Sequence, residues 1–127
     1  MRKGTISPIA AFRRYAEFLA STVDEEEAQR AVGTAIAPTA RIHEFTSNGN
    51  YTLTVAPTIA NGQDGEVVTL VNVGSNTITI QDQGTLANSN LRLTAATVAI
   101  GPRDSVTLYY SGDVGDWVQI GGLVSVI

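Results

Sequence analysis

The chain has 127 residues, of which 43% are apolar and 16% are charged, and its formal net charge is -4. This composition is too apolar for a disordered chain, yet no apolar run approaches the roughly 18 residues that a membrane-spanning helix requires. The lack of cysteine excludes a disulfide framework, a thiolate zinc site and a cysteine nucleophile.

The charges are distributed unevenly along the chain. Residues 1–37 hold five basic and five acidic side chains, and the remainder holds three basic and seven acidic ones. A nucleic-acid surface needs clustered lysine and arginine, so we expect no nucleic-acid partner. The stretch TISPIAAFRRYAEFLAS is interrupted by proline and by charged residues, which argues against a signal peptide and predicts a protein that is made and kept in the cytoplasm or assembled from there.

The first predicted element is a helix that begins near Ser7-Pro8, a favourable N-cap followed by a proline at the first helical position. Arg13, Arg14 and Glu17 lie on its polar side and are expected to be solvated. Its apolar side is formed by residues that recur at three- and four-residue spacing: Ile9, Phe12, Ala16, Leu19 and Val23.

A second helix start signal lies at Thr22–Glu25, where the spacing is that of a capping box, and the helical pattern ends at Gly33. Either two short helices meet near Ser21, or one helix kinks there. Residues 1–37 therefore read as an N-terminal helical arm, with residues 38–127 forming a second unit. The apolar stripe is narrow, so it needs a larger surface to pack on. That surface is either a partner, bound through Ile9, Phe12, Leu19 and Val23, or the sheet of the same protomer.

From Arg41 onward the pattern alternates, as in strands, and glycine- and asparagine-rich turns separate the segments. About eight strands in this region predict a compact antiparallel β-sandwich or barrel. The predicted strands are residues 40–45, 51–55, 66–73, 76–82, 90–95, 97–101, 105–111 and 116–121.

Alternation also predicts which side chains point into the core. Gln119, Arg92 and the intervening threonines should face outward. In EVVTLVNV the apolar residues occupy both parities, which indicates a strand covered on both faces, by the helical segment or by another subunit. The residues expected to point inward are Ile78, Ile80, Leu91, Leu93, Val98, Ile100, Val106, Leu108, Tyr110, Val118 and Ile120.

Few residues could carry chemistry. His43 is the only histidine, and the adjacent Glu44 should face the opposite way, so we interpret His43 as structural or surface-exposed and expect no catalytic triad. No histidine-based metal site is possible, and no metal or cofactor is expected. A calcium site at Asp113–Asp116 is the alternative to simple turn chemistry. Aspartates that we expect to bond turn backbone are Asp64, Asp82, Asp104, Asp113 and Asp116.

The glycine-containing stretches GSNTITI and NGQDG lack the lysine and the following helix of a phosphate-binding loop, and are predicted to be hairpin turns. Tyr109 and Tyr110 are adjacent in a strand, so only one of them should belong to the core. Trp117 is expected to close one end of the barrel. The alternative is a platform on which Trp117 stacks a sugar.

The series NGQDGEVVTLVNVGSNTITIQDQGTLANSNLRL, followed by IGPRDSVTLYYSGDVGDWVQIG, resembles a β module of tailed-bacteriophage virion proteins. Such modules occur in head decoration or head-fibre proteins and in tail-fibre and tailspike chains. The resemblance covers residues 61–122 and implies a structural, non-enzymatic role. It also implies a homo-oligomer, most often a homotrimer.

We therefore expect a capsid decoration protein, of the cement or head-fibre type, on the capsid surface of the virion. Its partners would be other copies of itself and the major capsid protein, with no membrane involved. The alternative is a glycan- or receptor-binding module of a tail fibre or spike, with Tyr109 or Tyr110, Trp117 and Asp113 facing the ligand. An enzyme is not expected.

Overall fold

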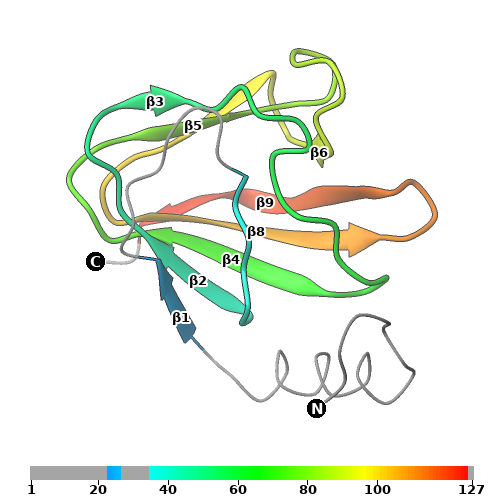
Figure 1. Cartoon of the computed structure of the whole chain (residues 1–127), viewed down its shortest axis with the longest axis horizontal. Coiled ribbons are helices and arrows are strands. Elements are labelled where there is room, and N and C mark those ends of the chain that lie inside the picture. The colour runs from blue at the N-terminus through cyan, green and yellow to red at the C-terminus, as the bar shows by residue number, and fades with distance from the viewer. Residues whose placement is uncertain (1–22, 27–34, 126–127) are drawn as a thin grey trace, which may run out of the picture.

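The structure, a computed structural model, describes residues 35–125 and the backbone of residues 23–26 (Figure 1). The fold is mainly β, as predicted, and each of the eight predicted strands overlaps an observed one. The strands are β1 (Val23–Glu26), β2 (Ile42–Phe45), β3 (Tyr51–Thr52), β4 (Val67–Asn72), β5 (Ile78–Gln81), β6 (Leu91–Arg92), β7 (Thr97–Ile100), β8 (Asp104–Ser111) and β9 (Asp116–Ser125).

The strands form two mixed sheets, which corrects the prediction of a purely antiparallel domain. A six-stranded sheet has the order β1-β2-β4-β8-β9-β6, and a three-stranded sheet has the order β3-β5-β7. The pairs β1–β2, β2–β4, β3–β5 and β6–β9 are parallel, whereas β4–β8, β5–β7 and β8–β9 are antiparallel.

The reason is the path of the chain between the layers. From β2 to β8 each successive strand lies in the other sheet, so strands that follow one another in sequence are not hydrogen-bonded neighbours. Gly74-Ser75-Asn76 thus carries the chain from β4 in one sheet to β5 in the other, and its prediction as a hairpin turn is wrong. Among the described strands, β1 and β2 and then β8 and β9 are the pairs that are consecutive in sequence and hydrogen-bonded; only β8 and β9 form an antiparallel hairpin.

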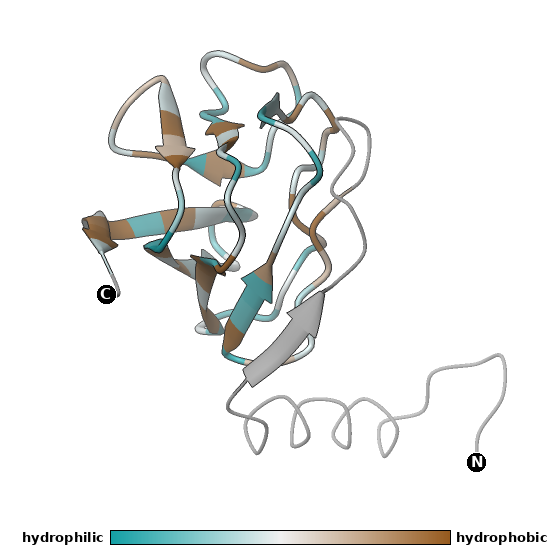
Figure 2. Ribbon diagram, turned by 90° about the vertical axis from the view of Figure 1, so that its left-hand side faces the viewer, coloured by the Kyte–Doolittle hydropathy of each residue, from teal (hydrophilic) through white to brown (hydrophobic). Residues whose placement is uncertain are grey.

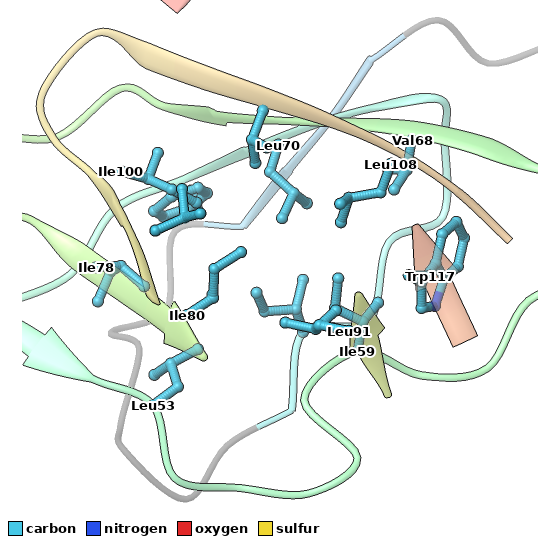
Figure 3. Close-up of a cluster of buried hydrophobic side chains, with 14 of the residues drawn as sticks. Leu53, Ile59, Val68, Leu70, Ile78, Ile80, Leu91, Ile100, Leu108 and Trp117 are labelled. Atoms are coloured by element: carbon cyan, nitrogen blue, oxygen red, sulfur yellow. The ribbon is translucent and has the colours of Figure 1, made fainter. Parts of the chain in front are cut away.

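The two sheets share one apolar core (Figure 3). Val68, Leu70 and Leu108 come from the larger sheet, and Ile78 and Ile80 come from the smaller one; all five are buried. Burial of this apolar area against the opposite layer is the main favourable contribution to folding. Neither sheet could bury this set of side chains alone, so the layers depend on each other.

The predicted facing is wrong for the last strand. Ile120 is 47% exposed, whereas Gln119 and Trp117 are buried. In β9, Trp117 lies opposite Tyr110 and Gln119 lies opposite Leu108, and residues directly opposite in an antiparallel pair share a face. Because Tyr110 and Leu108 face the core, the residues of β9 that lie opposite them, Trp117 and Gln119, face the core as well. Brown and teal bands alternate along the strands in Figure 2, as this two-sided arrangement requires.

Burial of Gln119 is compatible with folding because its amide is bonded. Its Oε1 accepts from the Thr94 N–H (2.9 Å) and from the Thr94 hydroxyl (3.2 Å). Its Nε2 donates to the Gly121 carbonyl (2.9 Å). A buried amide with these partners avoids most of the cost of removing a polar group from water.

The helix predicted to begin at Thr22–Glu25 is also contradicted, because Val23–Glu26 is β1. This segment runs parallel to β2 at the edge of the six-stranded sheet, where backbone pairing overrides a local capping signal. Ile36 belongs to the same fold, since it is buried and bridges Ile59. Sheet and core thus include residues on the N-terminal side of Pro38.

Candidate functional site

Of the five aspartates predicted to bond turn backbone, Asp82 and Asp104 accept hydrogen bonds from N–H groups of their own turns. Asp82 accepts from the N–H groups of Leu93 (2.7 Å) and Gly84 (2.8 Å). Asp104 Oδ2 accepts from the Gly101 N–H (3.1 Å). These carboxylates are thus used to close turns.

Asp64 makes a longer-range contact. Its Oδ1 accepts from the Gly112 N–H (2.7 Å), which ties the turn before β4 to the turn between β8 and β9. Asp116, at the start of β9, pairs with Arg92 of β6 at 2.9 Å. In the part of the chain that the structure describes, no three histidine or acidic side chains cluster in a way that could hold a metal ion.

His43 lies on the core side of β2 and is 2% exposed, while Glu44 is half-buried on the other side of the sheet. The two side chains face opposite ways, as predicted for neighbours in a strand. His43 is therefore a buried, structural residue of β2.

Trp117 closes one end of the shared core (Figure 3) and is 2% exposed. Its ring meets that of Tyr110 edge-to-face, with centroids 5.3 Å apart and an interplanar angle of 71°. Its Nε1 donates to the Ala60 carbonyl at 3.1 Å. With its faces inside the core and its polar atom bonded, the indole presents no platform to a sugar.

Tyr109 and Asp113, the other two residues predicted to face a ligand, are exposed. Tyr109 is 37% exposed and lies on the face of the six-stranded sheet opposite to that of Trp117. Asp113 lies in the turn between β8 and β9. The structure thus places Tyr109 and Trp117 on opposite faces of the sheet and Asp113 in the turn at its end.

A different feature stands out, and we call it the outer face: the side of the six-stranded sheet turned away from the core. The pairing brings apolar residues of β4, β8 and β9 together there. The outward facing of Val118 and Ile120 was missed, since it depends on the register of β9. The sequence held one indication of this face: in EVVTLVNV the apolar residues occur at both odd and even positions, which predicts a strand covered on both of its faces. Uncharged residues of this face include Ile42, Val67, Thr69, Thr107, Tyr109, Val118 and Ile120.

The residues predicted to bind a partner through the arm lie almost wholly outside the described residues. Ile9, Phe12 and Leu19 fall in the range 1–22, and Val23 is described only as backbone, in β1. Their role stays a prediction.

Among the described residues, no helix is long and apolar enough to cross a bilayer. No protein-family model matches the chain, and no curated protein matches it in sequence.

Proposed function

We propose that the chain is a structural protein of a tailed-bacteriophage virion. Specifically, it is a capsid decoration protein, of the cement or head-fibre type, that binds the major capsid protein as a homotrimer. The observation that carries this proposal is the turn-and-strand series of residues 61–122, which resembles the virion β module quoted above.

The way this series uses its polar residues supports a role based on shape and repeated contact. Asp64, Asp82 and Asp104 bind turn backbone, and Asp116 binds Arg92. Buried asparagines do the same: Asn72 Nδ2 donates to the carbonyls of Asn76 (2.6 Å) and Ile100 (2.9 Å). Polar groups committed to the backbone hold long connections in one conformation.

The alternative is a glycan-binding module of a fibre or spike, and the exposed ring of Tyr109 is the observation that favours it. Tyrosine presents a flat apolar surface with a hydroxyl at its edge, which suits a sugar ring. Replacement of Tyr109 by alanine would then abolish binding on a glycan array. The same replacement would leave capsid binding intact if decoration is the function.

The direct test is co-sedimentation of the purified chain with undecorated capsids assembled from the major capsid protein of the same virus. We expect saturable binding at a fixed ratio of copies to capsid protein. Light scattering should give three times the protomer mass of 13.4 kDa.

Binding that never saturates, or no co-sedimentation at all, would refute the decoration role. A monomer that nevertheless saturates the capsid would refute the trimer alone. Heat-unfolded protein, cooled and added at the same concentration, controls for non-specific trapping in the pellet.

A further inference from the structure

The outer face presents an exposed apolar row at one end of the six-stranded sheet. Val67 of β4 lies opposite Tyr109 of β8, which lies opposite Val118 of β9. Val67 and Tyr109 are 38% and 37% exposed. In the next row, Ile42, Thr69, Thr107 and Ile120 follow one another across four strands.

Neither row contains a charged residue: the first row lies on β4, β8 and β9, and the second lies on β2, β4, β8 and β9. The two threonines at the centre of the second row bond each other. The hydroxyls of Thr69 and Thr107 lie 3.0 Å apart and form a hydrogen bond. Because one hydroxyl accepts from the other, covering these threonines with apolar side chains costs less than covering two unpaired hydroxyls. The face is therefore well suited to an apolar cover.

The path of the chain indicates which segment provides that cover. Val23, the first residue of β1, lies in the same row as Ile42, Thr69, Thr107 and Ile120. Because β1 runs parallel to β2 and β4, the chain enters β1 at the end of the sheet where β4 begins with Val67. Residues 1–22 are thus joined to the sheet at the end that bears the exposed apolar row.

The lengths match. Ile9 and Leu19 are ten residues apart, so the apolar stripe would extend about 15 Å along a helix. The outer face from β2 to β9 spans three strand spacings, or about 14 Å. The three residues between Leu19 and Val23 separate the stripe from the edge strand.

We propose that residues 1–22 dock on the outer face of their own protomer, with Ile9, Phe12, Ala16 and Leu19 against the sheet. A segment joined directly to the edge strand is held at a millimolar effective concentration, which favours it over a second copy. Arg13, Arg14 and Glu17, on the other side of the predicted helix, would then remain in water. This inference does not depend on the proposed virion function.

The test uses the full chain with a nitroxide on a cysteine introduced by Arg13→Cys, which is unique because the chain has no other cysteine. The nitroxide should broaden the amide NMR signals of Thr107 and Ile120. In a mixture of nitroxide-labelled chain and isotope-enriched unlabelled chain, those signals should stay sharp. Signals that stay sharp in the labelled chain itself would overturn the proposal, and broadening in the mixture would assign the face to a second copy instead.

A pair of matched variants tests the surface itself. Ile120→Glu places a charge on the outer face, whereas Val114→Glu places one in the turn between β8 and β9; the two residues are 47% and 48% exposed. We expect Ile120→Glu to speed trypsin cleavage after Arg13 and Arg14 by about tenfold, because the undocked arm is open to the protease. Val114→Glu should leave the cleavage rate unchanged.

Equal cleavage rates in the two variants would overturn the proposal. Trp117 fluorescence, which reports on the buried core, establishes that both variants keep the fold. Capsid co-sedimentation is a separate readout, so failure of the docking proposal and failure of the virion proposal can be told apart.

Discussion

Gly62 lies against the indole ring of Trp117, and its lack of a side chain is required there. A Cβ at this position would lie 2.8 Å from Trp117 Cζ2 and 2.5 Å from Glu66 Oε1. Both neighbours are buried, so neither can move aside easily. Single contacts of this kind determine how closely the chain before β4 packs on the core.

We predict that Gly62→Ala lowers the free energy of unfolding by about 1–3 kcal/mol, the usual range for overpacking a well-packed site. Urea unfolding followed by Trp117 fluorescence measures the change. Gly122→Ala is the control, since a Cβ there meets nothing within 4 Å, and it should change stability by less than about 0.5 kcal/mol. Equal stability of the two variants would contradict the close packing at Gly62.

At the scale of elements, one side chain supports a segment that belongs to no strand. The backbone of Thr58 and Ile59 bridges Ile36 on one side: the Ile36 N–H donates to the Thr58 carbonyl at 2.9 Å. On the other side, the backbone of Thr58 and Ile59 is bonded to the buried side-chain amide of Asn90. That amide accepts from the N–H groups of Thr58 (3.1 Å) and Ile59 (3.3 Å) and donates to the Ile59 carbonyl (2.6 Å). Asn90 thus replaces a neighbouring strand.

We predict that Asn90→Ala lowers the free energy of unfolding by about 2–4 kcal/mol, because buried backbone donors and an acceptor lose their partner together. Hydrogen exchange at the amides of Thr58 and Ile59 should become faster by at least the factor that corresponds to the measured loss in the free energy of unfolding. Gln83→Ala, which truncates an amide on an exposed residue, should be nearly neutral. A small loss for Asn90→Ala would mean that water replaces the amide.

At the scale of the whole molecule, the two sheets have no separate cores. Ile80 of β5 and Leu70 of β4 belong to different sheets and to the same buried cluster. The alternating path of the chain adds to this coupling, because each crossing joins the layers covalently. A domain of this construction should unfold in one cooperative transition.

Ile80→Ala should therefore destabilise both sheets by the same amount, about 2–5 kcal/mol, as expected for a buried isoleucine. Circular dichroism of the backbone and fluorescence of Trp117, which lies in the other sheet, should report the same midpoint. Leu123→Ala, at an exposed position of β9, serves as the control. Two separate midpoints would show that the sheets unfold independently.

The sequence by itself determined the class of the fold and most of its strand positions, because alternation and turn residues are local signals. It also predicted that Asp82 and Asp104 bond the backbone of their turns and that His43 and Glu44 face opposite ways. In these cases the information lies within a few residues, as for Asp82 with Gly84, or in the parity of a strand.

Only the tertiary structure decided the sheet order, the parallel pairs and the facing of β9. Each depends on which segment lies beside which, and residues far apart in sequence supply the partners: Val23–Glu26 became a strand because β2 lies beside it. The outer face arose in the same way, since Val67, Tyr109 and Val118 form one row only once three strands are in register. Long-range pairing of this kind leaves no local pattern to read, because its energy comes from contacts that exist only in the folded chain.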